Sequence, residues 1–284
     1  MLTWPVAALG WITSLIQQAE SSQKRINEFL KISPNIVNKA SQDIDFQGNI
    51  EFKNVSFTYP DTGIKALQNI NFSINKGERL AIIGKTGSGK TTIADLLLRL
   101  YDATSGTVRI DGQDIKQLDF NNLRQKIGYV PQDVFLFSDT VAKNISFGNT
   151  SATKEQIEDA ARYSAVYEDI VGLSDGFETT IGERGVMLSG GQKQRISIAR
   201  AIIKKPDIII LDDCLSAVDS NTEQTILGYL NSELKDKTTI IITHRVYGLL
   251  QFDKIIVLDD GKIVAAGTHE ELMAQEGYYA KLMI

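Results

Sequence analysis

The segment of residues 84–92 reads GKTGSGKTT and combines glycines, a lysine and hydroxyl groups at a spacing suited to phosphate chemistry. It matches the pattern G-x-x-x-x-G-K-[ST], in which the glycines let the backbone curl so that successive N–H groups point at phosphate oxygens. Lys90 is placed to reach the β- and γ-phosphates of a nucleoside triphosphate, and the Thr91 hydroxyl to hold Mg²⁺. The predicted nucleotide-binding residues of this loop are Gly84, Lys85, Thr86, Gly87, Ser88, Gly89, Lys90, Thr91 and Thr92.

A pair of carboxylates closes a second apolar run, which reads PDIIILDD and ends in Asp212 and Asp213. In phosphate-loop proteins the acid at the end of this strand holds Mg²⁺, usually through water. We therefore expect Asp212 to hold the metal and Asp213 to stand where a base orients the attacking water. The alternative is that both acids only cap the turn that follows.

The segment LSGGQ, which ends in Gln192, places a hydroxyl and two glycines at the start of a predicted long helix. Ser189 and the backbone of Gly190 and Gly191, together with the helix dipole, form a second candidate anion site. The chain thus has two candidate anion sites, one of them the phosphate loop, and the puzzle is how both serve one nucleotide. Two chains packed head to tail solve it, because each triphosphate then lies between one chain's loop and the other chain's LSGGQ segment.

Predicted strands and helices must position the phosphate loop, the two aspartates and the LSGGQ segment. Alternating residues in 49–75 predict half-buried strands, while RLAIIG (79–84) is a continuous apolar run typical of a strand buried on both faces. The segment after the phosphate loop predicts a helix. Near the C-terminus, DDGK predicts a hairpin turn, and Thr268 with Glu271 predicts a capping box, which makes His269 structural. We interpret Cys214 as a packing residue.

The composition limits the possible partners. The chain has 284 residues, 43% of them hydrophobic, and a net charge of -5. An acidic protein is a poor partner for nucleic acid, which favours basic surfaces. One cysteine and two histidines offer no zinc-type cluster and no internal disulfide, so a reducing, cytosolic environment is expected.

The first residues differ in composition from the rest. The opening segment is apolar, and its first charged side chain is Glu20. It has no basic start, which is unlike a signal peptide, and it is shorter than a complete membrane span. We interpret residues 1–30 as the end of a last transmembrane helix with its cytosolic extension, followed by a linker at 31–48. The alternative is an amphipathic helix that packs on its own domain.

From Asn49 to the C-terminus, these motifs together resemble the nucleotide-binding domain of ATP-binding cassette (ABC) transporters. The resemblance implies that Tyr59 stacks on adenine, that Gln132 touches Mg²⁺ and senses the membrane domain, and that His244 contacts the γ-phosphate. It also implies that residues 216–219 (SAVD) cross a dimer interface. Taken singly, each side chain has an ordinary interpretation: Tyr59 is a strand aromatic, Gln132 a solvated loop residue and His244 a polar residue at a strand end.

The resemblance implies an α/β fold with a phosphate-loop NTPase (RecA-like) core. An antiparallel β edge subdomain and an inserted α-helical subdomain, at about 133–204, complete the domain at 49–284. The element GERG at 182–185 resembles the exporter type, and the apolar VFLF after Gln132 fits either a surface for an intracellular loop or the core. The expected protein is an exporter half-transporter at the cytoplasmic face of the cell membrane, with ATP and Mg²⁺ as cofactors and a transmembrane domain as partner.

Asp213 departs from the family pattern, in which a glutamate follows the magnesium aspartate. One missing methylene shortens the reach by about 1.5 Å. In the family, aspartate here is typical of the slow site of heterodimeric exporters, so we expect a partner half-transporter; a homodimer with two slow sites remains open because His244 is present. A soluble ABC ATPase and an ATP-sensing regulatory module without transport are the alternatives.

Overall fold

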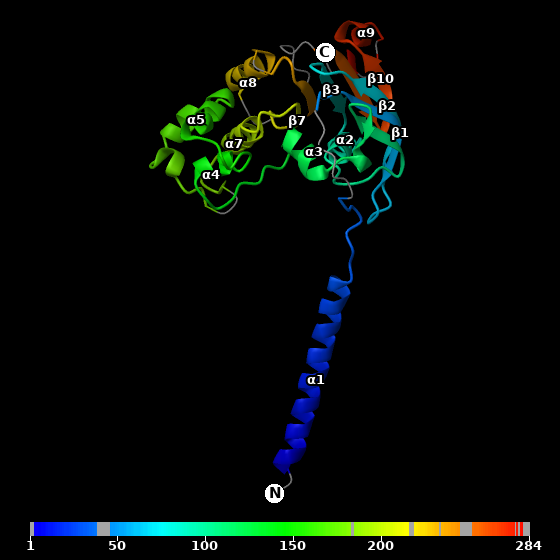
Figure 1. The fold of residues 1–284 in the computed structure, drawn as a ribbon, viewed down its shortest axis with the longest axis vertical. Helices are drawn as coiled ribbons and strands as arrows, with labels where there is room; N and C mark the ends of the chain where they lie inside the picture. The colour runs from blue at the N-terminus through cyan, green and yellow to red at the C-terminus, as the bar shows by residue number, and fades with distance from the viewer. Residues whose placement is uncertain are drawn as a thin grey trace. The chain divides into compact units, whose positions relative to one another are not determined.

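The computed structural model describes two compact units, residues 1–37 and 38–284 (Figure 1). The first unit consists mainly of helix α1 (Thr3–Leu30), in which no residue is buried. Within the described part of the chain, no helix combines the length and apolarity that a membrane crossing requires. The described residues are 3–38, 46–182, 185–215, 219–232, 234–244, 252–275, 277, 279 and 280.

The second unit is built on a 6-stranded sheet in which β3, β6, β7, β8 and β9 run parallel. All residues of β7 and β8 are buried, which explains the run of aliphatic residues in each strand. Because parallel strands end at the same edge, the ends of β3 and β7 bring Gly84 and Asp212 to one side of the sheet. In sheet order the strands are β10 (Lys262–Gly267), β9 (Lys254–Asp259), β3 (Arg79–Gly84), β8 (Thr238–Thr243), β7 (Ile208–Asp212) and β6 (Ile127–Val130).

A 4-stranded antiparallel sheet forms the predicted β edge, in the order β2-β1-β4-β5. Strands β1 (Ile50–Thr58) and β2 (Lys65–Ile74) pair antiparallel and confirm the half-buried strands expected in this region. The edge is larger than predicted, because β4 (Ser105–Ile110) pairs with β1 and β5 (Gln113–Asp114) pairs with β4. The alternation in β1 and β2 gave the signal for the first two strands, whereas the pairing of β4 depends on a long-range contact.

The inserted helical part has a hydrophobic core of its own, which includes Leu136, Ile145 and Ile196. Figure 1 shows α4, α5 and α7 gathered together, and residues of α4 and α5 contact α7. The α-helices of this part are α4 (Val141–Ser146), α5 (Lys154–Tyr163), α6 (Tyr167–Val171) and α7 (Gly190–Ile202). The remaining helices of the second unit are α2 (Lys90–Leu97), α3 (Phe120–Lys126), α8 (Ser220–Ser232) and α9 (His269–Ala274), with short 3-10 turns η1 (Ile115–Gln117) and η2 (Gly176–Glu178).

Smaller expectations have clear outcomes. The capping box of Thr268 and Glu271 is present, and Cys214 is buried, as predicted. The VFLF segment is mixed, because Leu136 is buried while Phe135 is exposed. Two expected segments fall partly outside the described residues. They are the exporter-type element at 182–185, of which 183–184 are not described, and the interface-crossing loop at 216–219, of which 216–218 are not described.

Candidate functional site

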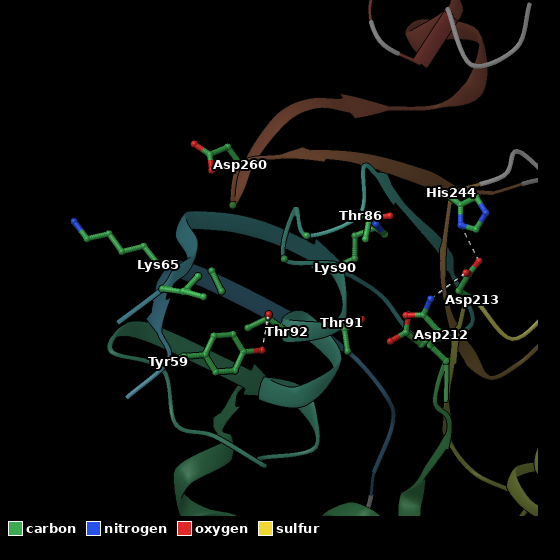
Figure 2. Close-up of a pocket in the computed structure, with 16 residues that line it drawn as sticks. Tyr59, Lys65, Thr86, Lys90, Thr91, Thr92, Asp212, Asp213, His244 and Asp260 are labelled. Atoms are coloured by element: carbon green, nitrogen blue, oxygen red, sulfur yellow. Dashed lines mark hydrogen bonds and ion pairs between the residues drawn. The ribbon is translucent and has the colours of Figure 1, made fainter. Parts of the chain in front are cut away.

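A cleft of about 400 Å³ opens where β3 and β7 end (Figure 2). Its wall is made by the phosphate loop, the acidic end of β7, the start of β2 and the turn between β9 and β10. The lining residues are Tyr59, Ile64, Lys65, Ala66, Thr86, Gly87, Gly89, Lys90, Thr91, Thr92, Gln132, Asp212, Asp213, His244, Asp260 and Gly261.

The phosphate loop fits its surroundings only with glycine at two positions. A Cβ on Gly84 would lie 2.2 Å from the Leu258 carbonyl oxygen. A Cβ on Gly89, where φ is +99°, would lie 2.4 Å from the Ala66 carbonyl oxygen. The loop is therefore pressed against β9 and β2, and its close approach to both strands explains the glycine spacing.

Lys90 lies inside the curl of the loop. Its Nζ donates to the carbonyl oxygens of Gly84 and Lys85, at 2.8 Å in each case. Burial lowers the pKa of Lys90, and the carboxylates of Asp212 and Asp213 oppose this shift. The ammonium group is thus held at the centre of the loop and faces the acidic end of β7.

Asp212 is buried, whereas Thr91 is exposed at the same end of the cleft. Burial raises the pKa of Asp212, a hydrogen bond with the Thr91 hydroxyl opposes the rise, and the charge of Asp213 adds to it. The Oδ2 atom of Asp212 is buried without a hydrogen-bond partner among the residues described. A buried carboxylate oxygen of this kind needs a cation or a donor.

Asp213 lies between the two other residues predicted to act in catalysis. Its Oδ1 is 3.1 Å from Nδ1 of His244, and its Oδ2 accepts a long hydrogen bond of 3.5 Å from Nε2 of Gln132 (Figure 2). Its backbone is left-handed, with φ of 46°, and its N–H donates to the Ile242 carbonyl. The structure therefore brings Gln132, Asp213 and His244 together.

Tyr59 marks the end of the cleft away from the acids (Figure 2). Its hydroxyl lies 3.0 Å from the Thr92 hydroxyl, and its ring packs edge-on against Phe57 and Tyr101. Burial raises the pKa of the Tyr59 phenol. The ring is fixed from behind and half-buried, which is the arrangement required of a stacking platform.

Sequence reasoning missed part of the wall, namely Ile64, Lys65, Ala66, Asp260 and Gly261. The turn after β9 is bound to the loop, because the N–H of Gly261 donates to the Ser88 carbonyl at 3.1 Å. The DDGK sequence predicts the hairpin but carries no signal for its place beside the phosphate loop, since that place depends on the pairing of β3 with β9.

The predicted second anion site lies outside this cleft. Ser189 caps α7, where its Oγ accepts from the N–H of Gln192 and its own N–H donates to Oε1 of Gln192. Ser189 and Gly190 are exposed, and none of the LSGGQ residues lines the cleft. Of the loop residues predicted from the sequence, Gly84, Lys85 and Ser88 are absent from the lining of the cleft.

The residues present fit a nucleoside triphosphate with a hard divalent cation. The two glycine positions make the loop a backbone cradle, and the orphaned Asp212 oxygen offers the single carboxylate that Mg²⁺ typically takes beside substrate phosphates. No cluster of three or more His, Cys, Asp or Glu side chains suited to a metal occurs among the residues with described positions.

Comparison with known proteins places this geometry in a family. A family model described as ABC transporter matches residues 67–216. The chain is 45% identical, over 98% of its length, to a probable multidrug resistance ABC transporter ATP-binding/permease protein of Bacillus subtilis (strain 168), of which it covers 48%. It is 41% identical over 99% of its length to an ATP-dependent lipid A-core flippase of Pseudomonas fluorescens (strain Pf0-1), of which it covers 47%.

A solved structure agrees with these relatives. A bacterial Atm1-family ABC exporter with ATP bound superposes with a TM-score of 0.90 at 37% identity, over 98% of this chain and 49% of that one. The chain spans about half the length of the relatives it matches. The matched profile and the fold together show that this chain belongs to the ABC transporter family, in which it corresponds to the nucleotide-binding domain.

Proposed function

We propose that this domain hydrolyses ATP in a head-to-tail dimer and drives export of a substrate across a membrane, with reduced hydrolysis at its own site. The observation that carries the proposal is the position of Ser189 and Gly190, which are exposed and lie outside the cleft that holds Lys90 and Asp212. The start of a helix attracts phosphate, because its free N–H groups and its dipole favour an anion, but this chain's own cleft does not bring a phosphate there. A second chain supplies one if its own cleft faces this surface.

Within the cleft, each residue has one task. The loop backbone and Lys90 bind the β- and γ-phosphates, and Tyr59 stacks on the base. Thr91, Asp212 and Gln132 would hold Mg²⁺, which when bound neutralises charge on the phosphate oxygens. The buried Asp212 oxygen and the 3.5 Å contact of Gln132 with Asp213 support this arrangement.

Asp213 is proposed to orient the attacking water, and His244 to contact the γ-phosphate. The carboxylate of Asp213 is held by Gln132 on one side and by His244 on the other, so its position is set by both neighbours. A side chain one carbon shorter than glutamate stops about 1.5 Å from where a glutamate carboxylate would reach. A misplacement of ~1 Å costs about 10²-fold in rate.

The partner is proposed to be a second half-transporter. In a heterodimer, a partner whose loop ends in glutamate would use this chain's LSGGQ segment at a faster site; in a homodimer both sites would be slow. Both relatives named above carry transport functions in their names, which supports an exporter at the cytoplasmic face of a membrane.

A transmembrane domain is the other proposed partner. A second cleft of about 580 Å³, lined by Leu100, Phe147, Arg200 and neighbouring residues, lies between the core and the helical part and suits an intracellular loop. The exposed Phe135 lies near this cleft, because the Phe137 ring contacts the rings of both Phe135 and Phe147. Helix α1 is proposed to continue from the last transmembrane helix, with residues 31–48 as the connection.

Phosphate release by the purified chain and by its Asp213→Glu variant tests the proposal. We expect the glutamate variant to hydrolyse ATP faster, by up to about 10²-fold, because its carboxylate reaches the water. Lys90→Ala is the matched control and should hydrolyse no ATP in either background. Equal rates for the wild-type chain and the Asp213→Glu variant would refute the reach argument, and absence of turnover in both would favour an ATP-sensing module, which Asp213 alone suggests.

A further inference from the structure

The side chain of Gln192 joins the start of its own helix, α7, to the neighbouring helix α6. Its Oε1 accepts from the Ser189 N–H at 2.9 Å, and its Nε2 donates to Oδ1 of Asp169 at 2.9 Å. The last residue of LSGGQ therefore has both ends of its amide in use. Its role is to hold the first turn of α7 in place.

Asp169 lies on α6, a different element from the helix it contacts. Its second oxygen, Oδ2, accepts from Nη1 of Arg195 at 2.8 Å, and the same Arg195 nitrogen also donates to the Ala165 carbonyl. Ala165 has a left-handed backbone, with φ of 55°. One carboxylate thus receives bonds from two residues of α7, and the arginine ties α7 to the strained turn before α6.

These contacts are more than a surface ion pair. The Arg195 side chain is 13% exposed and that of Asp169 32%. Partly buried hydrogen bonds to a charged group contribute more to stability than exposed pairs do. The Asp169 carboxylate therefore sets the direction of the Gln192 amide, which in turn sets the position of the Ser189 N-cap.

We propose that Asp169 is a positioning residue for the LSGGQ segment, and that it acts on the nucleotide bound to the opposite chain. The inference rests on the proposed head-to-tail dimer. It assigns to α6 the task of aiming Ser189 and the N–H groups of Gly190 and Gly191 at a phosphate. Asp169 lies outside the cleft lining of its own chain, so its loss should leave nucleotide binding there intact.

The first experiment compares Asp169→Ala with wild type in the full chain. We expect ATP hydrolysis to fall about tenfold, the effect of one charge-assisted hydrogen bond, while binding of a fluorescent ATP analogue to the single chain stays unchanged. Asp169→Asn keeps an acceptor for Gln192 but loses the charge opposite Arg195, and should recover part of the rate. Wild-type hydrolysis in Asp169→Ala would overturn the proposal.

A mixing experiment separates action on the opposite chain from a folding defect. Lys90→Ala and Asp169→Ala chains are each weakened alone, but a mixed pair contains one site with an intact loop and an intact LSGGQ segment. Hydrolysis in the mixture should exceed the mean of the two parents. No recovery would mean that Asp169 supports only its own chain.

The matched control repeats the mixing experiment with Gly190→Asp in place of Asp169→Ala. This variant puts a carboxylate at the start of α7, and it fits there because a Cβ at Gly190 meets no atom within 4 Å. Recovery with Gly190→Asp but not with Asp169→Ala would overturn the role of Asp169 and leave the head-to-tail dimer standing. Failure of both mixtures would overturn the dimer, and the inference with it.

Discussion

Asp212 and Asp219, seven residues apart in sequence, have opposite electrostatic surroundings. Burial raises the pKa of Asp212, whereas hydrogen bonds from Thr222 lower the pKa of Asp219 at the start of α8. A raised folded-state pKa means that the ionised Asp212 opposes folding at neutral pH and that this penalty disappears as the pH falls. Asp219 has the opposite sign: it stabilises at neutral pH and loses that effect in acid.

Asp212→Asn should therefore raise the free energy of unfolding by about 1 kcal/mol at neutral pH, in the presence of EDTA, because it removes a buried charge with an unpaired oxygen. The gain should shrink at acidic pH, where Asp212 is protonated. Urea unfolding across the pH range measures both effects.

Asp219→Asn is the control. It should lower stability at neutral pH, since it weakens contacts to the N–H groups of Asn221 and Thr222. A loss of stability in Asp212→Asn at neutral pH would contradict the claim that the buried Asp212 charge opposes folding. It would indicate that neighbouring groups compensate this charge.

At the scale of elements, the phosphate loop depends on its contact with β2. Gly89 has a left-handed φ and its missing Cβ faces the Ala66 carbonyl, whereas Gly87, with φ of +80°, has nothing within 4 Å of the same position. Both positions strain a side chain by about 1 kcal/mol, but only Gly89 adds a clash with backbone.

Gly89→Ala should accordingly lower the free energy of unfolding by at least about 2 kcal/mol, and Gly87→Ala by about 1 kcal/mol. Denaturant unfolding of the two variants gives the comparison. Equal losses would show that the loop moves away from β2 at little cost, and that the close approach does not explain the glycine at position 89.

At the scale of the whole second unit, the helical part must stay joined to the core while each keeps its own hydrophobic cluster. One direct contact is the stack of Tyr163, at the end of α5, on Tyr229 of α8, with ring centroids 4.1 Å apart and planes 21° apart. Stacked aromatic pairs contribute about 0.5–1.5 kcal/mol beyond the area they bury.

A double-mutant cycle of Tyr163→Ala and Tyr229→Ala should give a coupling energy of about 1 kcal/mol in urea unfolding. The same cycle on Tyr167 and Phe177, whose centroids lie 5.8 Å apart within the helical part, provides a comparison at longer range. Additive effects for Tyr163 and Tyr229 would show that the stack does not join the two parts.

The sequence by itself determined the local elements and the chemistry they carry. Glycine spacing predicted the phosphate loop, the apolar run of β7 predicted a buried strand ending at Asp212, and the hydroxyl and glycines of LSGGQ predicted the start of α7. These signals are local, because backbone conformation, burial on two faces and helix capping each depend on a few neighbouring residues.

Only the tertiary structure decided which distant residues meet. The turn at Asp260 and Gly261 joined the cleft wall through the pairing of β3 with β9, and Gln132 and His244 came together on Asp213 because β6 and β8 flank β7. The Nε2 of Gln192, in the predicted second anion site, donates to Oδ1 of Asp169 on α6, a contact that the sequence did not predict. Such contacts depend on strand order and helix packing, which no spacing along one segment encodes.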